Sequence, residues 1–311
     1  MIIMKIIQGP GNQMFQYAYA LAASKRVGTE FKLDLDWYNH HSDHRPYILD
    51  RFNISAAEAT KEEIEYIKTK NASNFIGYRW NLLRDKLAPP HKKTVVQEDV
   101  QSVDWNLKRP HTTSYIEGYF TSEKFFNDFA DDVKRELSFV GEMSDESKKT
   151  AELMQNTNSV AISFRRGDFL TKEWQNVCSL EYYHRAIESV KDLLENPVFF
   201  VFADELDWVK QNMELGVEVH YMDFNYPDYM QDMRLMTHCK NHIITNSTFS
   251  WWGAWLSGSN NIICPEYWLN PNIETHKKEF NGSWVEFSHV LPKSWKRIPN
   301  LVEGDTLMSL P

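Results

Sequence analysis

Between residues 158 and 264 the hydrophobic and polar positions alternate in blocks, with short apolar runs separated by longer amphipathic segments. The apolar runs predict strands at 159–164, 197–203, 217–222, 241–245 and 261–264. The amphipathic segments predict helices at 180–195, 205–213, 228–239 and 249–257. Since parallel strands need long crossover connections, this alternation is typical of a parallel sheet with helices on both faces.

The first residues show the same order on a smaller scale. An apolar run predicts a strand at 2–7, and a glycine turn at 9–11 follows it. Residues 12–26 predict an amphipathic helix that Gly28 ends, and period-two alternation predicts a second strand at 31–37. The chain therefore opens on a strand-helix-strand unit.

The rest of the first half predicts less. A serine N-cap favours a helix at 55–68, and two helical segments are predicted between 122 and 157. Prolines interrupt the pattern between residues 71 and 118, where no element is predicted. We expect an α/β protein with an N-terminal Rossmann-like domain at 1–155 and a C-terminal one at 156–311, whose tail packs back on the first domain.

The charge of the chain limits its partners. With 34 Lys and Arg against 43 Asp and Glu, the net charge of −9 argues against nucleic-acid binding, so any phosphate ligand must be bound locally. Cys178, Cys239 and Cys264 form no CxxC pair and are interpreted as buried thiols in a reducing compartment. No apolar run is long enough for a signal peptide or a membrane span. We expect a cytoplasmic protein, with peripheral contact at the inner membrane face left open.

Charge follows directly after the predicted strand at 159–164, in "FRRGDF". Arg165 and Arg166 offer forked hydrogen bonds that suit a diphosphate leaving group, Gly167 allows a tight turn, and Asp168 could orient an arginine or act as a base. A surface ion pair that closes a loop is the alternative.

A second polar stretch, "TNSTFSWW", lies where a strand passes into a helix. Backbone N–H groups at a helix start and nearby hydroxyls can bind an anion, and the predicted binding residues are Asn246, Ser247, Thr248, Phe249 and Ser250. N-capping by Ser247 or Thr248 is the alternative, and the two interpretations are compatible.

The glycine turn, "GPGNQM", resembles half of a dinucleotide fingerprint, but Met14 replaces the third glycine. That replacement weakens a dehydrogenase interpretation and leaves a turn at Gly11 with Asn12 and Gln13 as neutral donors.

Two stretches could concern a metal. "DLD" at 34–36 places two carboxylates on one side of a predicted strand, as metal-dependent sugar transfer can require, or it is a polar strand face. The histidines at 40, 41 and 44 are metal-capable but lie in an irregular loop.

Several segments together resemble the α-1,2-fucosyltransferases of glycosyltransferase family 11, in their soluble bacterial form. They are "GPGNQMFQYAYA", "RPYILDRFNI", "FRRGDF", "CSLEYYHRAI", "VFFVFADE" and "DMRLMTHCKNHIITNSTFSWWGAWL". The resemblance implies a GT-B fold, two Rossmann-like domains facing across a cleft, and inverting transfer of fucose from GDP-β-L-fucose to the 2-hydroxyl of a terminal galactose, in an acceptor such as lactose. It implies no metal and no cofactor.

The resemblance also assigns roles. Arg165 matches an arginine used on the β-phosphate with Arg166 as its neighbour, Asp204 matches a nucleotide-binding acid, and residues 247–249 match a phosphate-holding segment. Asn12 matches a residue near acceptor and phosphate.

One position departs from the family pattern. Ser163 stands where the family usually has histidine, which leaves the catalytic base open. Two alternatives therefore stay open: a related transferase with another sugar nucleotide or acceptor, and a GDP-sugar or glycan-binding protein without turnover.

Overall fold

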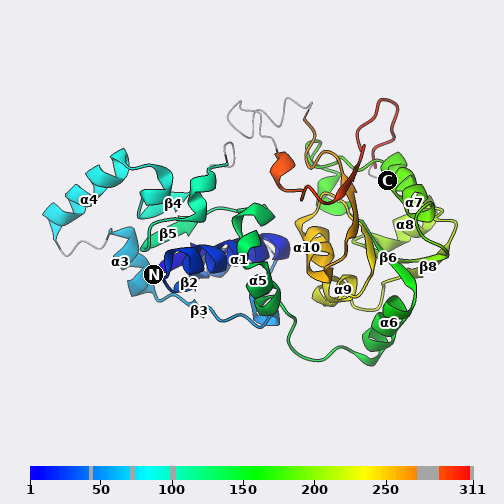
Figure 1. The fold of residues 1–311 in the computed structure, drawn as a ribbon, viewed down its shortest axis with the longest axis horizontal. Helices are drawn as coiled ribbons and strands as arrows, with labels where there is room; N and C mark the ends of the chain where they lie inside the picture. Colours follow the sequence, from blue (N-terminus) through cyan, green and yellow to red (C-terminus); the bar gives the residue numbers. More distant parts are fainter. Residues whose placement is uncertain (42–44, 71–73, 99–102, 272–286, 309–311) are drawn as a thin grey trace. The chain divides into compact units, whose positions relative to one another are not determined.

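The structure is a computed structural model of the chain and describes all residues except 42–44, 71–73, 99–102, 272–286 and 309–311. It divides into two compact units, Met1–Val140 and Gly141–Pro311, each built on its own parallel sheet (Figure 1). The division lies before the expected boundary at 155, because α6 (Asp145–Asn156) packs Ala151 and Met154 into the core of the second unit.

The first unit has a parallel sheet in the order β3-β2-β1-β5-β4. Its strands are β1 (Ile2–Lys5), β2 (Phe31–Asp34), β3 (Ala57–Glu58), β4 (Val95–Gln97) and β5 (Ser114–Glu117). Its helices are α1 (Pro10–Val27), α2 (Asp36–His40), α3 (Lys61–Lys68), α4 (Phe75–Leu87) and α5 (Ala130–Glu136).

Helix α1 is the centre of this unit. Gly9 is its N-cap, Pro10 occupies its first turn, and Gly28 ends it with a φ of 66°. The helix is buried almost all round, which requires apolar or internally bonded residues on every face. Tyr19, for example, stacks on Phe120 with ring centroids 3.7 Å apart.

The second unit has a parallel sheet in the order β11-β10-β9-β6-β7-β8. Its strands are β6 (Asn158–Phe164), β7 (Pro197–Ala203), β8 (Glu218–Tyr221), β9 (Asn241–Ile243), β10 (Asn261–Pro265) and β11 (Lys296–Ile298). Besides α6, its helices are α7 (Leu180–Lys191), α8 (Leu206–Asn212), α9 (Met230–Met236) and α10 (Thr248–Ser257). Numbered within the unit, the strand order is 3-2-1-4-5-6, which is the Rossmann order.

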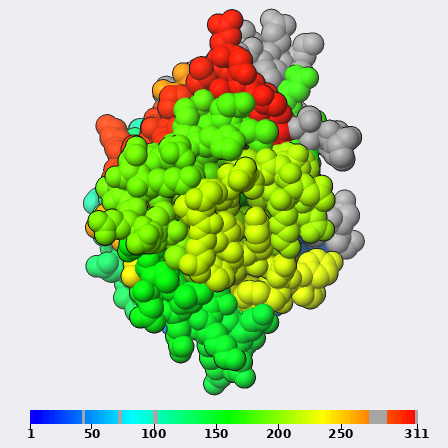
Figure 2. Space-filling model, turned by 90° about the vertical axis from the view of Figure 1, so that its right-hand side faces the viewer, coloured from blue at the N-terminus to red at the C-terminus, as the bar shows by residue number. Residues whose placement is uncertain are grey.

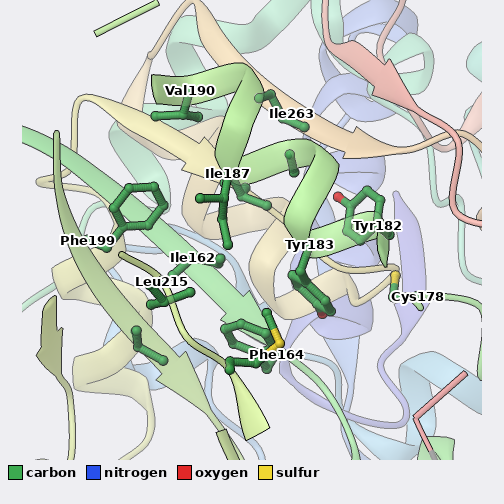
Figure 3. Close-up of a cluster of buried hydrophobic side chains, with 14 of the residues drawn as sticks. Ile162, Phe164, Cys178, Tyr182, Tyr183, Ile187, Val190, Phe199, Leu215 and Ile263 are labelled. Carbon is green, nitrogen blue, oxygen red and sulfur yellow. The ribbon is translucent and has the colours of Figure 1, made fainter. Parts of the chain in front are cut away.

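Strand β6 is buried on both faces, as expected for a central parallel strand. On one face Ile162 and Phe164 pack against Tyr183 and Ile187 of α7, which Figure 3 shows. On the other face Ala161 belongs to a second apolar cluster. The two clusters therefore cover β6 on both faces.

The structure confirms the order of elements predicted for the second unit and corrects the bounds of two elements predicted for the first. The strand and helix alternation after residue 158 and the α/β class are confirmed. The strand predicted at 31–37 ends at Asp34 because Asp36 begins α2. The helix predicted at 55–68 begins only at Lys61, where Thr60 and Glu63 form a capping box, and β3 precedes it.

The C-terminal tail packs on α7 of the second unit, and its expected return to the first unit stays a prediction. Arg185 of α7 donates to Asp305 Oδ2 at 2.6 Å, and the N–H of Leu180 donates to the carbonyl of Thr306. Figure 2 shows the tail, in red, lying against the green surface around α7.

Candidate active site

The candidate site lies at the carboxyl ends of β6, β7 and β9. Strand β6 pairs with β7 on one side and β9 on the other, so the chain direction of the crossovers reverses beside it. Ligands of open α/β sheets bind at such a switch point. The structure brings together the turn after β6, Asp204 and Glu205 after β7, and residues 245–250 after β9.

Arg165 is held at the rim of this turn. Its Nη1 donates to Asp204 Oδ2 at 2.8 Å, its Nη2 contacts Asp168, and its guanidinium lies 5.2 Å from the ring centroid of Phe169. The side chain remains 23% exposed. Each terminal nitrogen keeps one further hydrogen, and Nε–H makes no hydrogen bond to the described residues. Arg165 can therefore donate a fork to a ligand while Asp204 holds it.

Arg166 has a different environment, because its side chain is completely buried. Its Nε donates to Glu205 Oε2 at 2.9 Å, and its guanidinium lies 3.6 Å from the ring centroid of Trp208. The cation thus supports the turn from within the protein. The catalytic role predicted for Arg166 stays a prediction.

Asp204 and Glu205 together shape the turn. Asp204 Oδ1 accepts from the N–H of Arg166 at 3.0 Å, and Glu205 Oε1 accepts from the N–H of Gly167 at 3.1 Å. Gly167 has a φ of 31°, and a Cβ there would lie 2.9 Å from Asp204 Oδ2, so glycine is required. Burial raises the pKa of Asp204, and the charge of Arg165 opposes that shift.

Glu205 and Trp208 were not predicted as site residues. The only signal in the sequence is the acid next to Asp204, and nothing in it indicates that Trp208 would cover Arg166. Asp168, by contrast, is 56% exposed and is the most accessible of the three carboxylates at this turn. A ligand that approaches Arg165 can displace Asp168 more easily than Asp204.

Residues 163 and 245–246 connect β6 to β9. Ser163 Oγ accepts from the N–H of Thr245 at 3.2 Å. The amide Nδ2 of Asn246 donates to the carbonyls of Gln175 at 2.8 Å and Trp268 at 3.0 Å, and its Oδ1 accepts from the Thr245 hydroxyl. Ser163 therefore joins the end of β6 to the backbone after β9, and Asn246 fixes the loop.

The start of α10 divides the predicted phosphate-holding residues into two groups. Ser247 is the N-cap and its Oγ accepts from the N–H of Phe249, while Ser250 is buried and donates to the carbonyl of Ser247 at 3.0 Å. Thr248 is half-buried, and its hydroxyl makes no hydrogen bond within the described part of the chain. Residues 247–249 can therefore meet a ligand, and Ser250 faces inward.

The glycine turn of the first unit also contains both buried residues and one accessible residue. Gln13 is buried and saturated, since its Nε2 donates to the carbonyls of Gln8 and Pro46 and its Oε1 accepts from the N–H of Ile48 at 2.9 Å. Gly11 is buried as well. Asn12 is half-buried, and its amide makes no hydrogen bond to any described residue. Of the three predicted residues, Asn12 alone has a side chain free to bind acceptor.

The candidate metal ligands are dispersed. Asp34 is buried and accepts from the Tyr115 hydroxyl at 2.6 Å, whereas Asp36 belongs to α2 and its carboxylate lies 3.5 Å from His40 Nε2. They do not share one side of a strand, and the histidine at 44 lies outside the described residues. Among the residues that the structure describes, no group of three His, Cys, Asp or Glu is arranged to hold a metal ion.

The three thiols are buried and free, as predicted. Burial raises the pKa of Cys178 to about 11, so this thiol is neutral and unreactive at physiological pH. Within the described chain, no helix combines the length and apolar character needed to cross a membrane.

Comparison with solved structures identifies the fold. The fucosyltransferase NodZ from Bradyrhizobium is similar with a TM-score of 0.50 and 15% identity, over 84% of this chain and 94% of that chain. The two parallel-sheet units are the Rossmann-like domains of a GT-B fold.

Comparison with known families identifies the class of enzyme. The model of glycosyl transferase family 11 matches residues 96–288, which is more than half of the chain, and the chain belongs to this family. An alpha-1,2-colitosyltransferase of Escherichia coli is 29% identical over 96% of this chain and 98% of its own length. The human galactoside alpha-(1,2)-fucosyltransferase 1 is 24% identical over 67% of this chain and 63% of its own length. The family resemblance is thus confirmed, and the chain is a glycosyltransferase.

Proposed function

We propose that this protein is an inverting α-1,2-fucosyltransferase that moves L-fucose from GDP-β-L-fucose to the 2-hydroxyl of a terminal galactose. The observation that carries the proposal is Arg165, a cation at the Rossmann switch point that two carboxylates orient and that retains hydrogens for a ligand. We infer the α-1,2 linkage and the galactoside acceptor from the names of two relatives.

The proposed mechanism is an in-line displacement through an oxocarbenium-like state. The acceptor hydroxyl attacks C1 of fucose through its oxygen and releases its proton to solvent, while the bond from C1 to the β-phosphate oxygen breaks and GDP leaves with that electron pair. Arg165 and the start of α10 at 247–249 stabilise the charge that grows on the diphosphate. One preorganised donor of this kind contributes about 2.7–4 kcal/mol to the transition state.

Ser163 has no part in proton transfer in this proposal, because its hydroxyl is buried and bonded to Thr245. Asp168 orients Arg165 and yields part of that contact to the diphosphate. The proposal assigns no general base, and it includes neither a metal nor another cofactor. It places the enzyme in the cytoplasm, without a nucleic-acid partner.

The direct test is incubation of the purified protein with GDP-fucose and a panel of galactosides that includes lactose, with product mass and linkage analysis. We expect one added fucose, linked to the galactose 2-hydroxyl. Binding of GDP by calorimetry without any product would overturn the enzymatic proposal and favour the glycan- or nucleotide-binding alternative.

A second candidate function is transfer of colitose, because the colitosyltransferase relative spans nearly the whole chain. Colitose is fucose without its 3-hydroxyl, and a site that hydrogen-bonds a hydroxyl discriminates strongly against an analogue that lacks it. Competition between GDP-fucose and GDP-colitose at equal concentration separates the two candidates. A product ratio in favour of colitose would replace the proposed donor and leave the family unchanged.

A further inference from the structure

Helix α4 of the first unit carries its apolar side chains on the side that faces solvent. Ile76, Trp80, Leu83 and Leu87 repeat at the spacing of one helical face and are 80%, 69%, 50% and 79% exposed. Figure 1 shows α4 at one end of its unit, beyond the edge of the sheet. We call these four residues the α4 stripe.

The opposite face of α4 holds the helix through polar contacts. Asp85 is buried and accepts from Lys70 Nζ at 2.8 Å, from Arg84 Nη2 at 3.1 Å and from the N–H of Thr94 at 3.1 Å. An acid bonded in this way fixes the rotation of the helix about its axis. The outward direction of the α4 stripe is therefore built into the fold.

The charge around the stripe has one sign. Between Lys68 and Lys93 the sequence has seven Lys and Arg and a single acid, Asp85, although the whole chain carries a net charge of −9. Because Asp85 is buried, the exposed charge of this segment is basic. At 100° per residue, Arg79 and Lys86 flank the stripe on one side, and both are exposed. Arg84 flanks it on the other side, where it pairs with Asp85.

An apolar stripe between basic flanks matches the surface of an anionic bilayer. The aliphatic and indole groups enter the headgroup region, and Arg79 and Lys86 remain at the level of the phosphates. A second copy of the chain fits less well, because pairing of two stripes would bring basic flanks together without an exposed acid to neutralise them.

We propose that α4 docks this protein on membranes rich in anionic phospholipids, through insertion of the α4 stripe and attraction of Arg79 and Lys86 to lipid phosphates. The proposal is independent of the sugar that the enzyme transfers, since it uses no residue of the candidate active site.

Co-sedimentation of the full chain with vesicles tests the docking. We expect binding to vesicles of equal parts phosphatidylglycerol and phosphatidylcholine, and little binding to pure phosphatidylcholine. Ile76→Ser/Trp80→Ser/Leu87→Ser should lose at least about tenfold in partition coefficient. Arg79→Glu/Lys86→Glu should also lose about tenfold or more, since each basic residue contributes roughly a fivefold factor, and added salt should weaken the wild type more than this variant.

Matched controls make the same chemical changes on the second unit. Leu193→Ser removes a leucine that is 64% exposed, and Lys149→Glu/Lys240→Glu reverses two exposed lysines. Both controls should bind vesicles like the wild type, and circular dichroism should report a folded protein for every variant.

Three results would overturn the docking proposal. The first is a wild type that ignores anionic vesicles, and the second is equal losses in the α4 variants and the controls. The third is a solution dimer, seen by sedimentation velocity, that the α4 variants convert to a monomer without changing vesicle binding. Transfer to a water-soluble acceptor is a separate readout, so failure of the docking proposal is distinguishable from failure of the transferase proposal.

Discussion

The loops after β1 and after β6 occupy the same position in two parallel sheets, but they differ in chemistry. After β1 the chain passes through Gly9 directly into α1, and the polar side chains are neutral. After β6 a long charged segment separates the strand from α7, and Glu205, the N-cap residue of α8, accepts hydrogen bonds from this segment. The first loop joins strand and helix tightly, whereas the second provides fixed positive charge.

Within each loop, neighbouring residues take opposite roles. Arg165 is at the rim and Arg166 is buried, and Asn12 is half-exposed beside the saturated Gln13. In both cases the buried member shapes the loop that presents the other. Adjacent similar residues are therefore not interchangeable, and the following substitutions test that distinction.

The largest expected effect is on Arg165. Arg165→Ala removes the exposed cation and should lower turnover with GDP-fucose about a hundred- to a thousandfold. Arg165→Lys keeps the charge without the fork and should lower turnover at least about tenfold. Steady-state kinetics measure both, and near wild-type transfer by Arg165→Lys would remove this residue from the mechanism.

Substitution of the neighbouring arginine should act first on stability. Arg166→Leu removes the cation from Trp208 and leaves the Glu205 carboxylate without its counter-charge, which should lower the free energy of unfolding by about 2–4 kcal/mol. Urea denaturation measures this change. Lys149→Leu, an exposed control, should stay within about 0.5 kcal/mol of the wild type. Equal stability of Arg166→Leu and the control would contradict the supporting role of Arg166.

The loop after β1 should show a smaller difference between substitution of its buried residue and substitution of its accessible residue. Gln13→Leu leaves the buried N–H of Ile48 without its acceptor and removes the donor to the carbonyls of Gln8 and Pro46, so it should cost about 1–3 kcal/mol of unfolding free energy. Asn12→Ala should cost less than about 0.5 kcal/mol, because its amide bonds no described residue. If Asn12 contacts acceptor, its substitution should raise the KM for galactoside and leave that for GDP-fucose unchanged.

Asp168 separates orientation from base catalysis. Asp168→Asn retains a hydrogen-bond acceptor for Arg165 but loses the charge, so turnover should fall about tenfold while the pH profile keeps its shape. Loss of the acidic limb of that profile, together with a much larger drop in turnover, would instead identify Asp168 as the base.

The smallest expected effect is that of metal removal. Since Arg165 and α10 supply the positive potential, EDTA should leave turnover unchanged. Inactivation by EDTA that manganese reverses would return attention to Asp34 and Asp36, although the structure separates their carboxylates.

Much of the second unit could be predicted from its sequence, because each strand is a short apolar run and each helix has a periodic face. The first unit was less predictable. Strand β3 spans only Ala57–Glu58, and α4, which two prolines follow, has an apolar stripe that faces outward. The local pattern predicts little where an element is held by residues outside it, as α4 is by Lys70 and Thr94 through Asp85.

The sequence by itself determined the α/β class, the position of the charged turn and the family, because these depend on local periodicity and on motif order. Only the tertiary structure decided which arginine is exposed, why Gly167 is required, and that Ser163 holds Thr245. Those facts depend on contacts between β6, β7 and β9, whose residues lie tens of positions apart in the chain, so no window along the sequence contains them.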